Sequence, residues 1–268
     1  MYRIANRRKL SVPLFLCIGV SLATGLIRGG RQSAIQIIVA AIAYYLLIVL
    51  VKRDGRKLPW RFLLKILIFV AVIAVSFQTV GKLLGRTVQA DFLQYIAVYL
   101  CGSIRNLNEW LKEAHALPDV FGKMTFADLY PYLGRKFGHP EWIYVLDLPY
   151  LSANGRNSGN IYTTFYAYIY DFGYIGAVVL PFIMGFISEK VFKRAIKARL
   201  QSERNISFSV ILYGYVSYLL AFSFFSNKFY EGLVRQGFVK YVFFWIVMIY
   251  VVNRENIKWL VEYYEKNG

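Results

Sequence analysis

Cysteine, histidine and acidic side chains are scarce in this chain. Its 268 residues include 2 cysteines, 2 histidines and 15 acidic residues, against 32 basic ones. Cys17 and Cys101 are too few for a disulfide framework. His115 and His139 occur in no HExxH or Cys/His pattern, so we expect no metal site. The chain also contains no Walker A sequence and no Rossmann glycine fingerprint, so we expect no nucleotide or other cofactor.

Apolar residues, in contrast, are abundant. They make up 57% of the chain, above the roughly 45–50% that is usual in soluble domains. Runs of about 20 apolar residues recur, and each is long enough to cross a hydrocarbon core as a helix. These runs lack the alternation of a transmembrane β-barrel. We therefore predict an all-α integral membrane protein that forms a single domain over residues 1–268, with six transmembrane helices at 10–27, 32–51, 62–84, 161–188, 206–226 and 238–252.

The net charge of +17 has a pattern that indicates membrane topology and excludes a nucleic-acid footprint. Basic residues gather in segments 3–9, 52–61, 190–204 and 254–266, on alternate sides of successive spans. By the positive-inside rule, both termini are then cytoplasmic. The first apolar stretch is long for a signal peptide and has no small-residue cleavage site, so we expect a retained first helix.

The pattern leaves a long loop, residues 85–160, on the outer face. It holds seven basic and seven acidic residues and is electrically balanced. Apolar residues at helical spacing predict a helix within 89–117, and prolines interrupt the second half. We interpret GRNSG at 155–159 as a turn that follows no strand and leads into the fourth helix. The charged and aromatic residues of this partly helical loop suit sugar or phosphate binding, and they equally suit an interfacial aromatic belt with solvated charges.

Where the loop enters the fourth span, the sequence reads GNIYTTFYAYIYDFGYIG at 159–176. It places Asp171 inside a hydrophobic span, where an ionisable group is costly and by default marks function. The alternative is a packing role, in which Asp171 pairs with Arg235, Lys228 or a tyrosine hydroxyl. The outer turn RGGRQS at 28–33 carries Arg28 and Arg31, whose planar guanidinium groups suit phosphate oxygens or lipid headgroups.

Three segments together resemble the C-terminal part of O-antigen or oligosaccharide repeat-unit polymerases of the Wzy type. They are IRGGRQSAIQIIVAAIAYYLL at 27–47, YIAVYLCGSIRNLNEWL at 95–111 and the 159–176 sequence, the most specific of the three. Polymerases of this family are usually longer and have more spans. They also often show a spaced arginine–glycine pattern in the outer loops, which this chain lacks. The resemblance implies a membrane glycosyltransferase of the bacterial inner membrane.

The resemblance further implies a reaction and a set of residues. Such enzymes transfer a growing glycan from an undecaprenyl diphosphate carrier to the next lipid-linked repeat unit, next to membrane lipids and alongside a flippase and a chain-length regulator. An O-antigen ligase-like transferase and a truncated, non-catalytic remnant are the alternatives; the few charged residues within the spans argue against a transporter. The expected catalytic candidates are His139, Glu141 and Asp171. The expected substrate-binding residues are Arg28, Arg31, Arg105, Arg135, Arg156, Asn160, Tyr162, Thr163, Tyr166 and Trp142.

Overall fold

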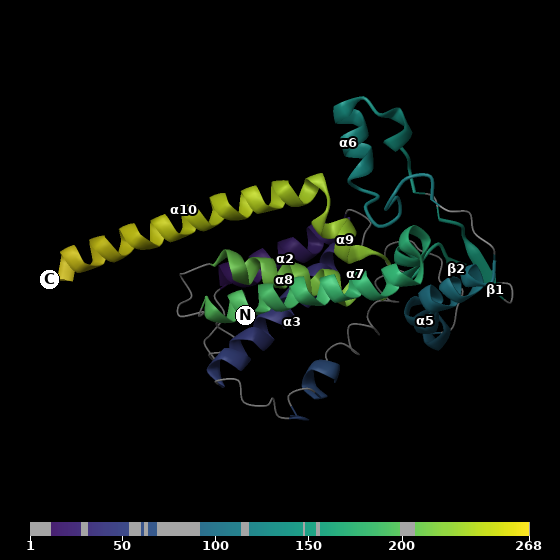
Figure 1. Cartoon of the computed structure of the whole chain (residues 1–268). Helices are drawn as coiled ribbons and strands as arrows, with labels where there is room; N and C mark the ends of the chain where they lie inside the picture. The colour runs from purple at the N-terminus through teal and green to yellow at the C-terminus, as the bar shows by residue number, and fades with distance from the viewer. Residues whose placement is uncertain are drawn as a thin grey trace. The chain divides into compact units, whose positions relative to one another are not determined.

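Helices dominate the architecture of the computed structural model (Figure 1). The structure describes residues 12–27, 32–53, 60–61, 64–68, 92–113, 118–146, 148–153, 156–198 and 207–267. The mostly helical membrane class predicted from the sequence is confirmed in this coarse form. The elements are α2 (Val12–Ile27), α3 (Gln32–Lys52), α5 (Phe92–Leu111), α6 (Tyr130–Phe137), the 3-10 turn η1 (Pro140–Trp142), β1 (Leu151–Ala153), β2 (Arg156–Gly159), α7 (Thr164–Lys197), α8 (Phe208–Phe222), α9 (Lys228–Leu233) and α10 (Gln236–Asn267).

Three helices are long and apolar enough to cross a membrane: Ala34–Lys52 in α3, Thr164–Lys197 in α7 and Gln236–Asn253 in α10. They correspond to the second, fourth and sixth predicted spans. Their length and composition make this a membrane-associated protein. The Thr164–Lys197 helix extends beyond residue 188, where the sequence predicted its end. It includes the basic residues of segment 190–204 as far as Lys197.

Six spans are not supported by the described part of the chain. Helix α2 has 16 residues and α8 has 15, both short of the roughly 20 residues that a perpendicular crossing needs. Most of the third predicted span, 62–84, lies outside the described residues. Its described part, residues 64–68, is helical.

The chain divides into two compact units. The first contains residues 1–59, 186–218 and 239–268. Its buried centre is formed by Leu47, Ala195 and Val210. On α3, the Tyr44 hydroxyl donates a hydrogen bond of 3.3 Å to the carbonyl oxygen of Ile211 on α8. An added Cβ on Gly214 would lie 2.5 Å from the same tyrosine ring, so glycine permits the close approach of these two helices.

The second unit contains residues 60–185 and 219–238. All the buried polar or charged residues of the described chain belong to it, and so do the elements that carry the candidate site. They are Ser103, Asn106, Thr125, Thr163, Thr164, Asp171, Ser223 and Asn227. Buried polar groups require hydrogen-bond partners, so this unit is held together by polar contacts as well as by apolar packing.

Within this unit, the structure confirms the helix predicted in 89–117 and corrects the 155–159 turn. Residues 92–111 form α5. The GRNSG sequence is not a turn after an unstructured loop, because residues 156–159 form β2, which pairs antiparallel with β1 and places Leu151 opposite Gly159. Glycine and asparagine are depleted in strands, and pairing with the neighbouring β1 overrides that tendency.

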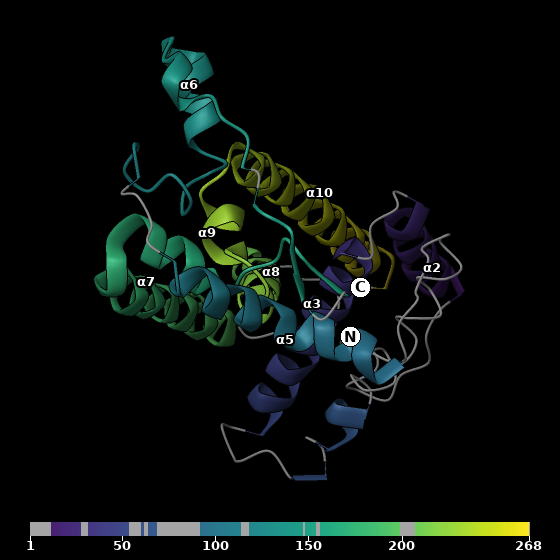
Figure 2. The same ribbon diagram turned by 90° about the vertical axis from the view of Figure 1, so that its right-hand side faces the viewer.

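Helix α7 is broken near its start, and its first part curls in both views (Figures 1 and 2). Gly173 has φ 63° and ψ −160°, a conformation that is essentially restricted to glycine. An added Cβ on Gly176 would lie 2.5 Å from the carbonyl oxygen of Tyr168. The Asp-Phe-Gly sequence at 171–173 therefore contains a sharp corner at Gly173, and Asp171 lies in the short helical piece before it.

Candidate functional site

The buried carboxyl group of Asp171 binds the backbone of the segment between α5 and α6. Its Oδ1 accepts a hydrogen bond from the Met124 N–H at 3.1 Å, and its Oδ2 accepts one from the Thr125 N–H at 2.6 Å. The Thr125 side chain in turn donates to the carbonyl oxygen of Ala167 on α7 at 3.4 Å. Both carboxyl oxygens are thus used to hold one loop segment against the first part of α7.

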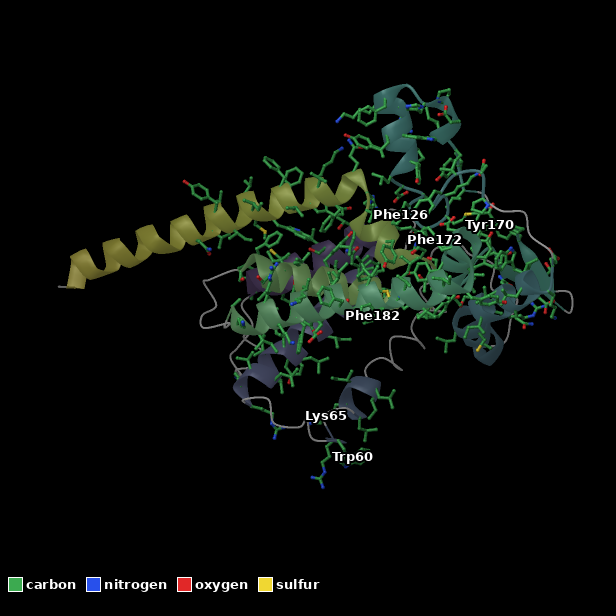
Figure 3. All side chains as sticks on the ribbon, in the orientation of Figure 1. Trp60, Lys65, Phe126, Tyr170, Phe172 and Phe182 are labelled. Atoms are coloured by element: carbon green, nitrogen blue, oxygen red, sulfur yellow. The ribbon has the colours of Figure 1, made fainter. Side chains whose placement is uncertain are left out.

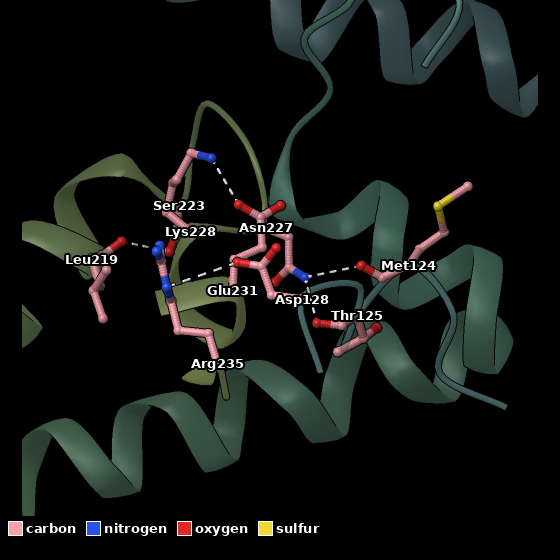
Figure 4. A network of polar contacts seen from close by, with 9 residues as sticks. All are labelled: Met124, Thr125, Asp128, Leu219, Ser223, Asn227, Lys228, Glu231 and Arg235. Atoms are coloured by element: carbon pink, nitrogen blue, oxygen red, sulfur yellow. Dashed lines mark hydrogen bonds and ion pairs between the residues drawn. The ribbon is translucent and has the colours of Figure 1, made fainter. Parts of the chain in front are cut away.

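The same two loop residues are held from their carbonyl side by Asn227, which directly precedes α9. Its Nδ2 donates to the Met124 oxygen at 3.3 Å and to the Thr125 oxygen at 2.9 Å (Figure 4). Asp171 accepts from the N–H groups and Asn227 donates to the C=O groups, so the pair satisfies backbone groups that would otherwise be buried without partners. We call this arrangement the loop clamp: Asp171, Met124, Thr125 and Asn227.

A second polar joint connects α5 with the segment that leads into α7. Asn106 is fully buried, and its Nδ2 donates to the carbonyl oxygens of Gly159 at 3.1 Å and Ile161 at 2.9 Å. One helical turn earlier, the Ser103 hydroxyl donates to the Phe224 oxygen at 2.9 Å. Two polar side chains on one face of α5 therefore bind the segment that leaves the β1–β2 hairpin and the turn after α8.

Aromatic rings cover this joint. Trp110 of α5 meets Tyr166 edge-on with ring centroids 4.7 Å apart, and Tyr162 lies 4.6 Å from Tyr166. Tyr162 and Tyr166 are buried, and the Tyr162 hydroxyl donates to the Pro149 oxygen at 3.0 Å. Tyr170, labelled in Figure 3, stacks on Tyr166 at 6.0 Å. Trp110 and Tyr170 remain half-buried, so they provide the more accessible rings of this cluster.

The other predicted residues of the loop gather around η1. His139 Nδ1 and Glu141 Oε1 are 2.8 Å apart, and the His139 ring stacks on Trp142 with centroids 4.4 Å apart. Hydrogen bonds from its own backbone N–H and from His139 lower the pKa of Glu141. His139 and Glu141 are exposed. The two residues form an acid–base pair in water, a geometry that allows proton exchange with a bound hydroxyl.

The predicted ionic partners of Asp171 are engaged elsewhere. Arg235 lies 4.0 Å from Asp128, and Lys228 lies 2.7 Å from Glu231 (Figure 4). Asp171 instead bonds to backbone N–H groups, a partner that the pairing hypothesis did not consider. Every residue except proline has a backbone N–H, so the sequence could not indicate which residues donate to Asp171.

The remaining predicted binding residues are only partly brought together. Thr163 is buried close to the Asn106 joint, and Asn160 is half-buried beside it. Arg105 is half-buried on α5, next to Asn106, whereas Arg135 is exposed on α6. Arg28 and Arg31 lie outside the described residues, as does the side chain of Arg156.

Sequence reasoning missed Ser103, Asn106, Trp110 and Asn227. The first two stand three residues apart on α5, and this spacing places polar groups on one helix face. That signal could have identified them, because a polar pair on a buried face needs partners. Asn227 had no comparable signal, since it follows a turn of serine and phenylalanine residues.

Among residues that the structure describes, no group of three or more His, Cys, Asp and Glu side chains could hold a metal ion. The chemistry available at the site is therefore that of carboxyl, imidazole, amide, hydroxyl and guanidinium groups next to aromatic rings. Comparisons with family models, with curated proteins and with solved structures give no match for this chain.

Proposed function

We propose that this protein is a polymerase of lipid-linked oligosaccharide repeat units, a membrane glycosyltransferase of bacterial surface polysaccharide synthesis. One observation carries the proposal. Two of the three segments that resemble such polymerases, 95–111 and 159–176, meet in one joint: Asn106 binds the Gly159 and Ile161 oxygens, and Trp110 packs on Tyr166. Segments far apart in sequence that form one polar and aromatic site are expected of a binding centre.

The proposed reaction needs no ATP. A hydroxyl of the acceptor repeat unit attacks the anomeric carbon of the donor glycan, the bond from that carbon to the diphosphate oxygen breaks, and the hydroxyl proton passes to a base. The lipid diphosphate leaves with an additional negative charge, which preorganised cations stabilise. Arg105, which precedes Asn106 on α5, is proposed for this purpose, with Arg28, Arg31, Arg135 and Arg156 as further candidates.

The proton acceptor is proposed among the carboxyl and imidazole groups of the loop. His139 and Glu141 are exposed and hydrogen-bonded to one another, which leaves a basic group that an acceptor hydroxyl can reach. Asp171 uses both carboxyl oxygens on backbone N–H groups. We therefore assign Asp171 to positioning and place the base function on the His139–Glu141 pair.

The proposal includes a membrane arrangement. The chain crosses the bacterial inner membrane six times, with both termini in the cytoplasm, and the loop at 85–160 faces outward with the lipid-linked substrate. Undecaprenyl diphosphate-linked oligosaccharide is the substrate, and the flippase and chain-length regulator are partner proteins. The basic clusters at 52–61 and 190–204 support this orientation.

The test is the length of surface polysaccharide in a source strain that lacks the gene. Loss of a polymerase leaves a single repeat unit on each acceptor, whereas loss of a ligase leaves repeat units polymerised but not attached. We expect deletion to collapse the ladder and the 268-residue chain to restore it. An unchanged ladder after deletion would reject the proposal.

A further inference from the structure

The loop segment 118–146, which we call the cap, carries exposed apolar side chains that nothing in its own fold covers. Phe137 at the end of α6 is 62% exposed, Ile143 is 47% exposed and Val145 is 91% exposed. Isolated exposed apolar residues are common on proteins, but a contiguous group indicates an interaction surface. We name these three residues the cap patch.

Two observations relate the three residues of the cap patch to one another. An added Cβ on Gly134 would lie 3.0 Å from Cγ1 of Ile143, so Ile143 packs beside α6, and Phe137 follows Gly134 by three residues on the same helix face. Residues 143–146 run without helical structure, and Ile143 and Val145 are exposed while Tyr144 between them is half-buried. The Tyr144 hydroxyl donates to the Lys123 oxygen at 2.8 Å, which turns its neighbours outward.

The charges of the cap indicate what the patch contacts. Its three described acids are each paired: Asp119 with Lys123 at 2.8 Å, Asp128 with Arg235 at 4.0 Å and Glu141 with His139 at 2.8 Å. Arg135 and Lys136 are exposed and have no acidic partner in the described part of the chain. The Lys136 ammonium lies 5.6 Å from the centre of the Phe137 ring, so one uncompensated cation adjoins the cap patch directly and Arg135 precedes it in the chain.

We propose that the cap patch inserts into the surface of an anionic phospholipid bilayer, with Arg135 and Lys136 at the headgroup phosphates. Apolar side chains flanked by basic ones are the arrangement by which interfacial segments bind such surfaces. Long basic side chains reach the headgroups while their neighbours enter the acyl region. The three candidate membrane-spanning helices keep the chain at a bilayer in any case, and the aromatic residues Tyr130, Trp142 and Tyr144 of the cap suit an interface.

The proposal concerns the cap alone and stands independently of the polymerase function. Its test uses the full chain with its two free cysteines, Cys17 and Cys101, replaced by serine. A single Val145→Cys site carries an environment-sensitive fluorophore, and the protein is reconstituted into phosphatidylcholine–phosphatidylglycerol vesicles. Quenching of the fluorophore is measured twice, once with a spin-labelled lipid and once with iodide on both sides of the membrane. Asp119→Cys, at the start of the cap where the side chain is 69% exposed, is the matched control.

The label at residue 145 is expected to be quenched by the spin-labelled lipid and protected from iodide, and the label at residue 119 to show the reverse. Arg135→Gln with Lys136→Gln should reduce the lipid quenching in phosphatidylglycerol vesicles to the level seen in pure phosphatidylcholine. Quenching of residue 145 by iodide alone would overturn the proposal. Protection from both quenchers would also overturn it and would indicate a protein partner or a second copy. Ile143→Cys provides an independent second position if Val145→Cys fails to fold.

Discussion

The carboxyl group of Asp171 and the backbone N–H of Thr125 are 46 residues apart in the chain and 2.6 Å apart in space. The Asn227 amide holds the carbonyl oxygen of the same Thr125 at 2.9 Å, from a position 102 residues later. Three distant segments therefore meet at one buried residue, Thr125. The segment between α5 and α6 is fixed to the start of α7 and to the turn before α9 at this point.

Asp171→Asn should release the loop clamp. An amide side chain offers one acceptor oxygen where the carboxyl group offers two, and its NH2 group would face a backbone N–H. A buried donor that loses its partner costs roughly 1–3 kcal/mol. We expect faster proteolysis within residues 118–146 when the purified chain is treated in detergent micelles. Cleavage at the wild-type rate would contradict the clamp.

Glu189→Gln is the matched control for this substitution. Glu189 lies on the same helix and pairs with Lys193, but both side chains are more than half exposed. Exposed ion pairs contribute about 0–1 kcal/mol, so proteolysis of the cap should not change. Equal effects of the two substitutions would show that loss of any α7 acid loosens the protein.

Asn227→Ala should weaken the same clamp from its other side, and its effect should depend on Asp171. Residues that hold one common group have coupling free energies of roughly 0.5–3 kcal/mol. A double-mutant cycle with Asp171→Asn, followed by denaturant unfolding in mixed micelles, measures this coupling. We expect the double variant to lose less stability than the sum of the single variants. Strict additivity would mean that the two side chains act independently.

Gly173→Ala should destabilise the corner in α7, although an added Cβ there meets no atom within 4 Å. The reason is the backbone, because a non-glycine residue in this conformation costs roughly 1–3 kcal/mol. Gly185→Ala is the control, since it lies on the same helix with equal space and no positive φ. Thermal unfolding in detergent should separate the two variants. Equal midpoints would show that Gly173 does not require its conformation.

The sequence predicts the helical membrane class, the helix within 89–117 and the unusual position of Asp171 in an apolar segment. These features follow from composition, from spacing on one helix face and from the cost of an ionisable group in an apolar segment. The break at Gly173 and the backbone partners of Asp171 do not follow in this way. A glycine in an apolar span is compatible with a straight helix, and backbone hydrogen bonds do not depend on which residues donate them.

The strand at 156–159 shows a related limit. Its composition predicts a turn, and the structure pairs it with Leu151–Ala153 in a hairpin. Strand preference depends on the neighbours that a segment meets, here β1 and α5. Asn106 is the opposite case, because its contacts with Gly159 and Ile161 join two segments that the resemblance to polymerases had already singled out. The resemblance predicted their importance, and only the structure gives the side chain that connects them.

The measurement that tests the account most directly is the polysaccharide ladder of the deletion strain that expresses either Asn106→Ala or Asn108→Ala. Asn106 is buried in the joint between α5 and the start of α7, whereas Asn108 is exposed on the same helix. At equal abundance in the membrane, we predict that the Asn106 variant leaves single repeat units and that the Asn108 variant restores the full ladder. A full ladder from the Asn106 variant would contradict the claim that this joint is the polymerising site.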